Sequence, residues 1–123
     1  MTVRLATADD LPAVMNVLDG ADLAIDADTV SRRIDARTVL VADGTAIPVG
    51  ALVAIPRPAG VHIEAIAVRR RRRDRGIGSS LVESAADRWG RLTATVDPPV
   101  RDFYASLSFD LEARGERYWA ERV

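Results

Sequence analysis

In the stretch "AVRRRRRDRGIGSSL" (residues 67–81), an apolar, strand-like segment runs through an arginine-rich turn into a helix-like segment. Arginine occupies six of the seven positions 69–75, and two glycines and two serines follow within the next five residues. Glycine lets the backbone approach a ligand closely, and the first turn of a helix presents N–H groups without internal partners. An anion is a natural occupant there. The stretch therefore allows two interpretations: a loop that holds one small phosphate group, or a basic patch for a nucleic acid.

Length and composition limit the number of domains, the kinds of metal site and the partners that the chain can have. With 123 residues, we expect a single domain over residues 1–123. The chain has no cysteine and one histidine, so disulfides, thiolate metal sites and multi-histidine centres within the chain are excluded, and we expect no metal. There is no apolar run of about 20 residues and no signal-like start, so we expect a soluble, cytoplasmic protein without a membrane partner. A net charge of −1 argues against a nucleic-acid partner.

Hydrophobic spacing and turn residues predict a mixed α/β sheet with helices on its faces. Thr7 and Asp10 have the form of a capping box before the first helix. The expected order is β-α-α-β-β-β-α-β-α-β-β. Strands are expected at 3–6, 38–42, 49–55, 61–68, 92–96, 109–113 and 117–122, and helices at 11–18, 28–36, 76–89 and 100–107.

Two spaced motifs give a more specific indication. Val68 to Gly78 has the form V-x-x-x-x-R/Q-x-x-G-x-G/A, and "DPPVRDFYASLSF" (residues 97–109) is close to N-x-x-A-x-x-F-Y-x-x-x-G-F. Together with the order of elements, these motifs resemble the GNAT superfamily of N-acyltransferases over essentially the whole chain. Phe103, Tyr104 and Phe109 match the second motif, whereas Asp97, Val100 and Ser108 replace its Asn, Ala and Gly.

The resemblance implies acetyl-CoA, or another short acyl-CoA, as the co-substrate. It implies that the backbone of the strand before the loop bonds the pantetheine arm, with the Val68 N–H as an oxyanion donor, and that the loop cradles the pyrophosphate. Arg69 to Arg72 are expected to be solvated. The cofactor-binding residues implied in this way are Ile66, Ala67, Val68, Arg73, Asp74, Arg75, Gly76, Ile77, Gly78, Ser79, Asp97 and Tyr104.

Acyl transfer to an amine needs a base, a donor to the oxyanion and an acid for the thiolate. Side chains alternate along a strand, which predicts that His62, Glu64, Ile66 and Val68 share one face. The resemblance implies a carboxylate base on this strand, so Glu64 is the first candidate and His62 the second; the alternative is an exposed face with a salt bridge to an arginine. Tyr104 matches the family's acid, and its alternative role is a core side chain.

We therefore expect an N-acetyltransferase that moves the acetyl group of acetyl-CoA to a primary amine by direct transfer in a ternary complex. The alternatives are a non-catalytic acyl-CoA-binding domain of the same fold and, more remotely, a nucleic-acid module. A small-molecule or peptide amine is the expected acceptor partner, and homodimers are common among proteins that the chain resembles. Residues that could serve the acceptor are Asp22, Asp26, Asp28, Tyr118 and Trp119.

Overall fold

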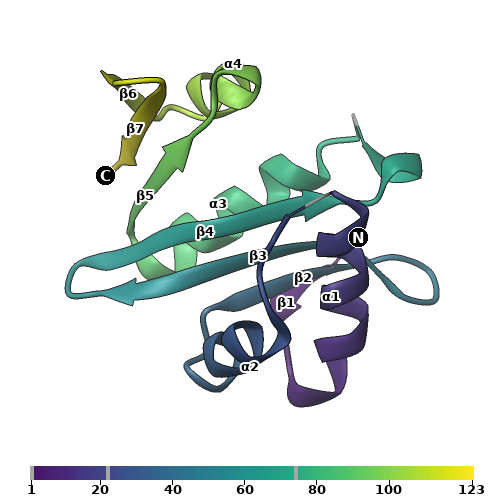
Figure 1. Cartoon of the computed structure of the whole chain (residues 1–123). Coiled ribbons are helices and arrows are strands. Elements are labelled where there is room, and N and C mark those ends of the chain that lie inside the picture. Colours follow the sequence, from purple (N-terminus) through teal and green to yellow (C-terminus); the bar gives the residue numbers. More distant parts are fainter. Residues whose placement is uncertain (1, 22, 74) are drawn as a thin grey trace.

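A seven-stranded mixed sheet organises the computed structural model, which describes residues 2–21, 23–73 and 75–123 (Figure 1). The strand order is β1-β2-β3-β4-β5-β7-β6, and β4–β5 is the parallel pair. The predicted order of elements is confirmed, with ends that differ by at most two residues. The strands are β1 (Thr2–Leu5), β2 (Val39–Asp43), β3 (Pro48–Arg57), β4 (Gly60–Val68), β5 (Arg91–Val96), β6 (Asp110–Arg114) and β7 (Arg117–Arg122). The helices are α1 (Leu11–Gly20), α2 (Ala27–Asp35), α3 (Ile77–Trp89) and α4 (Arg101–Ser106).

Helices cover both faces of the sheet and divide the core in two. α1 and α2 lie on one side and α3 on the other (Figure 1). Val14 and Leu18, one helical turn apart on α1, are fully buried against β2, β3 and β4, and Leu81 and Ala85 do the same on α3. Each fully buried leucine or valine contributes roughly 1.5–3 kcal/mol. No helix in the described part of the chain is long and apolar enough to cross a membrane.

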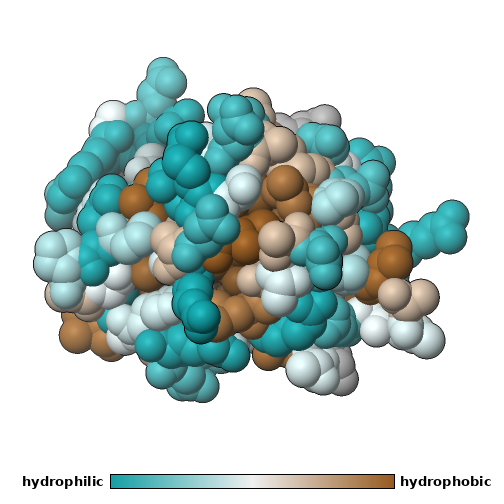
Figure 2. Space-filling model, turned by 90° about the horizontal axis from the view of Figure 1, so that it is seen from below, coloured by the Kyte–Doolittle hydropathy of each residue, from teal (hydrophilic) through white to brown (hydrophobic). Residues whose placement is uncertain are grey.

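The face seen from below Figure 1, to which α2 lies closest, has apolar surface in its centre and hydrophilic side chains around it (Figure 2). The half-buried apolar residues packed onto the core beneath α1 and α2 include Leu11, Met15, Leu23 and Ile25. These residues come from α1 and from the connection between α1 and α2. That connection also borders the functional cleft described below.

The parallel strands β4 and β5 separate partway along their length. They pair from Gly60–Arg91 to Ile63–Ala94, and β4 then continues to Val68 with β3 as its remaining partner (Figure 1). Where the pair begins, a Cβ on Gly60 would lie 1.9 Å from the Arg91 carbonyl oxygen, so this contact requires glycine. The strands therefore diverge and leave the edge of β4 open over its second half.

A β-bulge at Glu64 changes which residues share a face of β4. Ile63 pairs with Ala54 and Ala65 with Val53, so Glu64 is an extra residue on its strand. Ile63 then belongs to the core on the α3 side, and Ala65 to the core beneath α1 and α2. The prediction that His62, Glu64, Ile66 and Val68 share one face is therefore wrong. The extra residue resets the alternation, so that Ile66 and Val68 pack towards α3 while His62 lies on the opposite face.

The arginine run is only partly solvated. The Arg69 guanidinium donates from Nε to the Pro48 carbonyl oxygen at 3.0 Å and from Nη1 to Asn16 Oδ1 at 2.6 Å. The expectation of a solvated side chain is therefore wrong for Arg69, which ties β4 to α1 and to the start of β3. Arg70 and Arg71 are exposed, and Arg72 is half-buried.

Candidate active site

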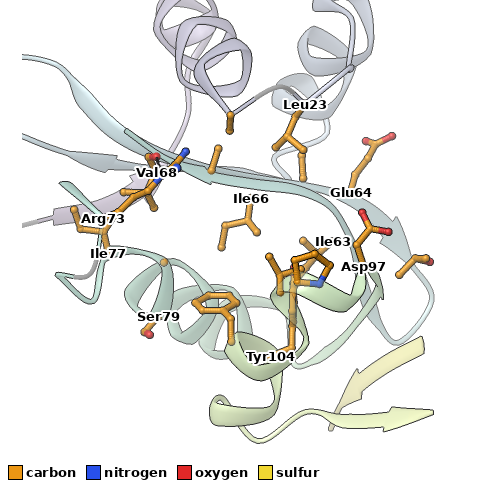
Figure 3. A pocket seen from close by; sticks show the side chains of 18 of the residues that line it. Leu23, Ile63, Glu64, Ile66, Val68, Arg73, Ile77, Ser79, Asp97 and Tyr104 are labelled. Carbon is orange, nitrogen blue, oxygen red and sulfur yellow. Dashed lines mark hydrogen bonds between the residues drawn. The ribbon is translucent and has the colours of Figure 1, made fainter. Parts of the chain in front are cut away.

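A cleft of about 1210 Å³ opens where β4 leaves β5. Figure 3 shows Arg73, Ile77 and Ser79 at one end of it, and Glu64 and Asp97 together at the other. The structure does not bring the exposed Arg75 to the cleft, and Asp74 lies outside the described residues. The predicted site residues that do line it are His62, Glu64, Ile66, Ala67, Val68, Arg73, Gly76, Ile77, Gly78, Ser79, Asp97 and Tyr104.

The first end of the cleft is the N-terminus of α3. Gly76 caps the helix in the left-handed conformation, with φ of 76°, and its carbonyl accepts the Ser80 N–H at 2.9 Å. No side chain of the described residues caps the helix, so the N–H groups of Ile77, Gly78 and Ser79 are free to bind an anion. A Cβ on Gly78 would come within 3.2 Å of the Phe103 ring, so glycine also lets α4 pack here. This arrangement fits the pyrophosphate of a coenzyme A thioester.

The open edge of β4 supplies backbone groups along the cleft. The Arg69 N–H donates to the Val49 carbonyl oxygen, and Val68 stands opposite Gly50. Ladder hydrogen bonds alternate along antiparallel strands, so Ile66 and Val68 direct their N–H and C=O groups away from β3 and into the cleft. The Val68 carbonyl accepts from Arg73 Nε at 3.0 Å. By the same alternation Ala67 directs its N–H and C=O groups towards β3, although it also lines the cleft, and its role in binding the cofactor stays a prediction.

Tyr104 belongs to the hydrophobic core and also lines the cleft. The ring packs edge-on against Phe103 and Phe109, with centroids 5.3 and 5.2 Å away, and only 6% of the residue is exposed. Burial raises the pKa of the Tyr104 phenol to about 12. The hydroxyl therefore stays protonated over the working pH range and can act as a hydrogen-bond donor.

His62 is held in one orientation by its neighbours. Its Nδ1 lies 2.8 Å from Thr93 Oγ1, and its ring stacks on Trp119 at 5.5 Å. The Arg114 guanidinium covers the same indole at 4.9 Å. Burial, followed by the charge of Arg57, lowers the pKa of His62, against the opposing effect of Glu64. The imidazole is therefore neutral at pH 7 and able to accept a proton.

The two carboxylates at the second end of the cleft are each paired with an arginine. Glu64 Oε1 lies 3.2 Å from Arg33 Nε, and Asp97 Oδ1 lies 3.0 Å from Arg117 Nε. The salt bridge that was the alternative interpretation of Glu64 is thus present, although Glu64 also lines the cleft. Sequence reasoning missed Arg33, Arg117 and Thr93 because their contacts depend on strand register and on distant elements.

The other residues predicted for the acceptor lie elsewhere. Asp26 caps α2 by accepting the Thr29 N–H at 2.7 Å, and this bond lowers the pKa of its carboxyl. Asp28 is exposed in the first turn of α2, and Asp22 lies outside the described residues. Tyr118 lies beneath the Arg101 guanidinium, and Trp119 reaches the cleft only through its stack with His62. Within the described residues, no group of three potential metal ligands is present.

The sequence model of the acetyltransferase (GNAT) domain family matches residues 35–110, so the chain belongs to this family. This confirms the resemblance and makes the protein an acyltransferase that uses coenzyme A as the acyl carrier. No curated protein sequence matches the chain.

Solved structures agree on the fold. Ard1 from Thermoplasma volcanium superposes with a TM-score of 0.82 and 18% identity, over 98% of this chain and 95% of that one. Naa50 from Arabidopsis thaliana, in complex with the bisubstrate analogue CoA-Ac-MVNAL, superposes with a TM-score of 0.81 and 16% identity, over 99% of this chain and 97% of that one. N-acetylglutamate synthase from Neisseria gonorrhoeae, complexed with coenzyme A and L-arginine, superposes with a TM-score of 0.80 and 16% identity, over 98% of this chain but only 32% of that one.

Proposed function

We propose that the protein acetylates a primary amine by direct transfer from acetyl-CoA within a ternary complex. The observation that carries this proposal is one continuous cleft with two chemically different ends. Free helix N–H groups at one end suit a pyrophosphate, and ionisable side chains at the other suit an amine. Both substrates can therefore occupy the cleft at once.

Each group in the cleft has a task in this reaction. Acetyl-CoA supplies an acetyl group activated as a thioester. The N–H groups of Ile77, Gly78 and Ser79 bind the pyrophosphate, and the Val68 N–H donates to the acetyl carbonyl oxygen. Glu64 or His62 takes the proton from the amine, directly or through water. The Tyr104 hydroxyl donates a proton to the departing thiolate.

Two observations support a single displacement over a covalent acyl-enzyme. The 123 residues include no cysteine, so the thiol that commonly accepts an acyl group is missing from this chain. The structure of Naa50 holds an analogue that joins CoA to a peptide, and this chain shares its fold. An amine that attacks the thioester directly needs no further nucleophile.

Release of the coenzyme A thiol, followed with a panel of amines, tests the proposal. Initial rates at varied concentrations of both substrates should give intersecting double-reciprocal lines, and protein incubated with acetyl-CoA alone should keep its mass. Parallel lines with an acetylated protein would refute direct transfer. A thermal shift with acetyl-CoA but no thiol release with any amine would favour the non-catalytic binding domain.

Two further proposals concern the surroundings of the enzyme. We propose that it forms a homodimer, as is common among proteins that it resembles, and that it works in the cytoplasm. Sedimentation of the purified protein measures the first, and fractionation of the native cells measures the second. A monomer at micromolar concentration would contradict the dimer.

A further inference from the structure

The end of the cleft that holds Glu64 and Asp97 is called the acceptor end below. Two pairs of oppositely charged side chains lie there. Glu64 is paired with Arg33, and Asp97 with Arg117. Glu64, Asp97 and Arg117 all line the cleft, and Figure 3 shows Glu64 and Asp97 at the same end of it. Both the Asp97 and Arg117 side chains are about two-thirds exposed, at 65% and 64%. Exposed pairs of this kind contribute about 0–1 kcal/mol, so a ligand can open this one.

This charge pattern discriminates between classes of amine. A diamine or polyamine would bring a second cation next to Arg33 and Arg117, and among the residues that the structure describes no third carboxylate lines the cleft to compensate it. A simple monoamine would use the carboxylates and leave the guanidiniums without a partner. An amine that carries its own carboxylate can satisfy both signs at once, because its ammonium meets Glu64 and Asp97 while its carboxylate meets Arg117.

Apolar side chains form part of the remaining wall at this end, beside the polar Thr95 and His62. Leu23 from the α1–α2 connection and Ile55 from β3 border the cleft, together with Val100, which is 46% exposed. Apolar walls of this kind favour burial of a hydrocarbon group. The acceptor that fits has one amino group, one carboxylate and an apolar portion.

We propose that the acceptor is a free α-amino acid with an apolar side chain, held by Arg117 through its carboxylate. This inference rests on the proposed function and names the substrate class of the same site. The amino nitrogen bonds the acetyl carbon as the carbon–sulfur bond breaks. The ammonium first gives one proton to Glu64 or His62 and so becomes the neutral amine that attacks. After the attack the nitrogen loses a second proton to water, and the thiolate takes a proton from Tyr104, whose hydroxyl water then restores. The products are the N-acetylamino acid and free coenzyme A.

Comparison of L-leucine with L-leucinamide in the full-length protein tests the inference. The two acceptors differ in the carboxylate and also in amine pKa, so the informative quantity is how a variant changes their ratio of kcat/KM. Arg117→Gln should lower the leucine-to-leucinamide ratio about tenfold or more, the loss expected for one charged hydrogen bond. Arg88→Gln, the same charge change at the exposed end of α3, should leave the ratio unchanged. Arg117→Lys should restore part of the preference.

The result that overturns the inference is an unchanged ratio in Arg117→Gln, or a wild-type enzyme that prefers putrescine or a peptide N-terminus over leucine. Calorimetric binding of leucine and leucinamide to the protein–coenzyme A complex gives a second readout that needs no turnover. Leucine should bind at least about tenfold more tightly than leucinamide, and Arg117→Gln should remove the difference. If coenzyme A binds and leucine is selected but no amine is acetylated, the proposed function fails, whereas Arg117 remains the residue that binds the carboxylate of a free amino acid.

Discussion

Tyr104 is the residue whose two roles can be separated by one atom. Tyr104→Phe keeps the ring between Phe103 and Phe109 and removes only the hydroxyl. We expect kcat to fall by about 10²–10⁴-fold, the usual loss of general acid–base help. The melting temperature and the acetyl-CoA dissociation constant should stay near the wild-type values, which titration and thermal melts measure. A variant that turns over at the wild-type rate would make Tyr104 a core residue only.

Glu64 and His62 compete for the role of base, and pH separates them. Without its base, the enzyme depends on solvent to deprotonate the amine, so the loss should be largest at low pH and partly recover as pH rises. Because the pKa of His62 is lowered, a His62-dependent limb of kcat/KM should fall below pH 6.5, the usual value for histidine. We expect Glu64→Gln to show the pH-dependent loss between pH 6 and 9. If His62→Gln shows it instead, His62 is the base.

Ser108 stands where the family motif has glycine, and its backbone has φ of 68° in the left-handed region. That conformation costs a residue with a Cβ about 1–2 kcal/mol, whereas glycine adopts it freely. Ser108→Gly should therefore raise the free energy of unfolding by about 1 kcal/mol. As an opposite control, Ser106→Gly at the end of α4 should lower it, because the Ser106 hydroxyl donates to the Phe103 carbonyl. Urea melts measure both changes.

Among the elements, the N-terminus of α3 should tolerate a neutral side chain at position 76 but lose coenzyme A binding when that side chain is negatively charged. A Cβ at Gly76 would meet nothing within 4 Å, so both aspartate and asparagine fit there, although both share the strain of φ 76°. Gly76→Asp places a negative charge where we expect the pyrophosphate, and it should abolish the melting-temperature shift that coenzyme A causes. Gly76→Asn matches its shape without the charge and should keep most of the shift. Equal shifts in both variants would place the pyrophosphate elsewhere.

The elements themselves could be predicted because their signals are local. Helical spacing on α1 and α3, and turn residues such as Gly76 and Gly90, mark the ends within the sequence. The bulge at Glu64 leaves no such mark, because Ile63 and Ala65 are both apolar and continue the alternating pattern on either side of it. Only the pairing with β3 shows that they belong to different cores.

In the candidate site, too, the features with local signals could be predicted from the sequence, and those that depend on distant elements could not. The loop and Tyr104 lie in contiguous motifs, so their positions follow from spacing. Arg69 bonds Asn16, 53 residues earlier in the chain, and Arg33 pairs with Glu64, 31 residues later. These partners depend on how α1 and α2 pack on the sheet, which local patterns do not determine. At the end of the cleft that holds Glu64 and Asp97, the sequence therefore predicted the carboxylates but not the arginines that pair with them.

At the scale of the whole molecule, the sheet consists of two parts joined by a short parallel contact. β1–β4 carry α1, α2 and α3, and β5–β7 form the other part with α4 nearby (Figure 1). The cleft lies at their junction, with β4 and α3 on one wall and Tyr104 and Asp97 on the other. Interactions of the first part that lie away from the cleft should therefore change stability without changing the chemistry.

The Arg4–Asp10–Asp43 cluster is such an interaction. Arg4 Nη1 lies 2.8 Å from Asp10 Oδ2 and Arg4 Nε lies 2.8 Å from Asp43 Oδ2, so one guanidinium joins β1, the end of β2 and the turn before α1. The Thr7 N–H also donates to Asp10 at 2.7 Å, which is the Asp10 half of the predicted capping box. The hydrogen bonds from Arg4, followed by the Thr7 N–H, lower the pKa of Asp10 from 3.8 to about 2 against the effect of burial.

Because the folded pKa of Asp10 is lowered, its stabilising contribution is fully present above pH 3.8 and is lost as pH falls towards 2. Asp10→Asn should lower the free energy of unfolding at pH 7 by about 1–2 kcal/mol, somewhat less than the full shift implies because the Arg4 side chain is 38% exposed. The difference from wild type, followed by urea melts, should shrink between pH 4 and 2. Asp9→Asn, the same charge change at the exposed neighbouring residue, should cost little at any pH. Since the cluster lies away from the cleft, kcat/KM of Asp10→Asn at pH 7 should match wild type; an equal stability loss at pH 2 and 7 would show that the carboxylate charge is not its cause.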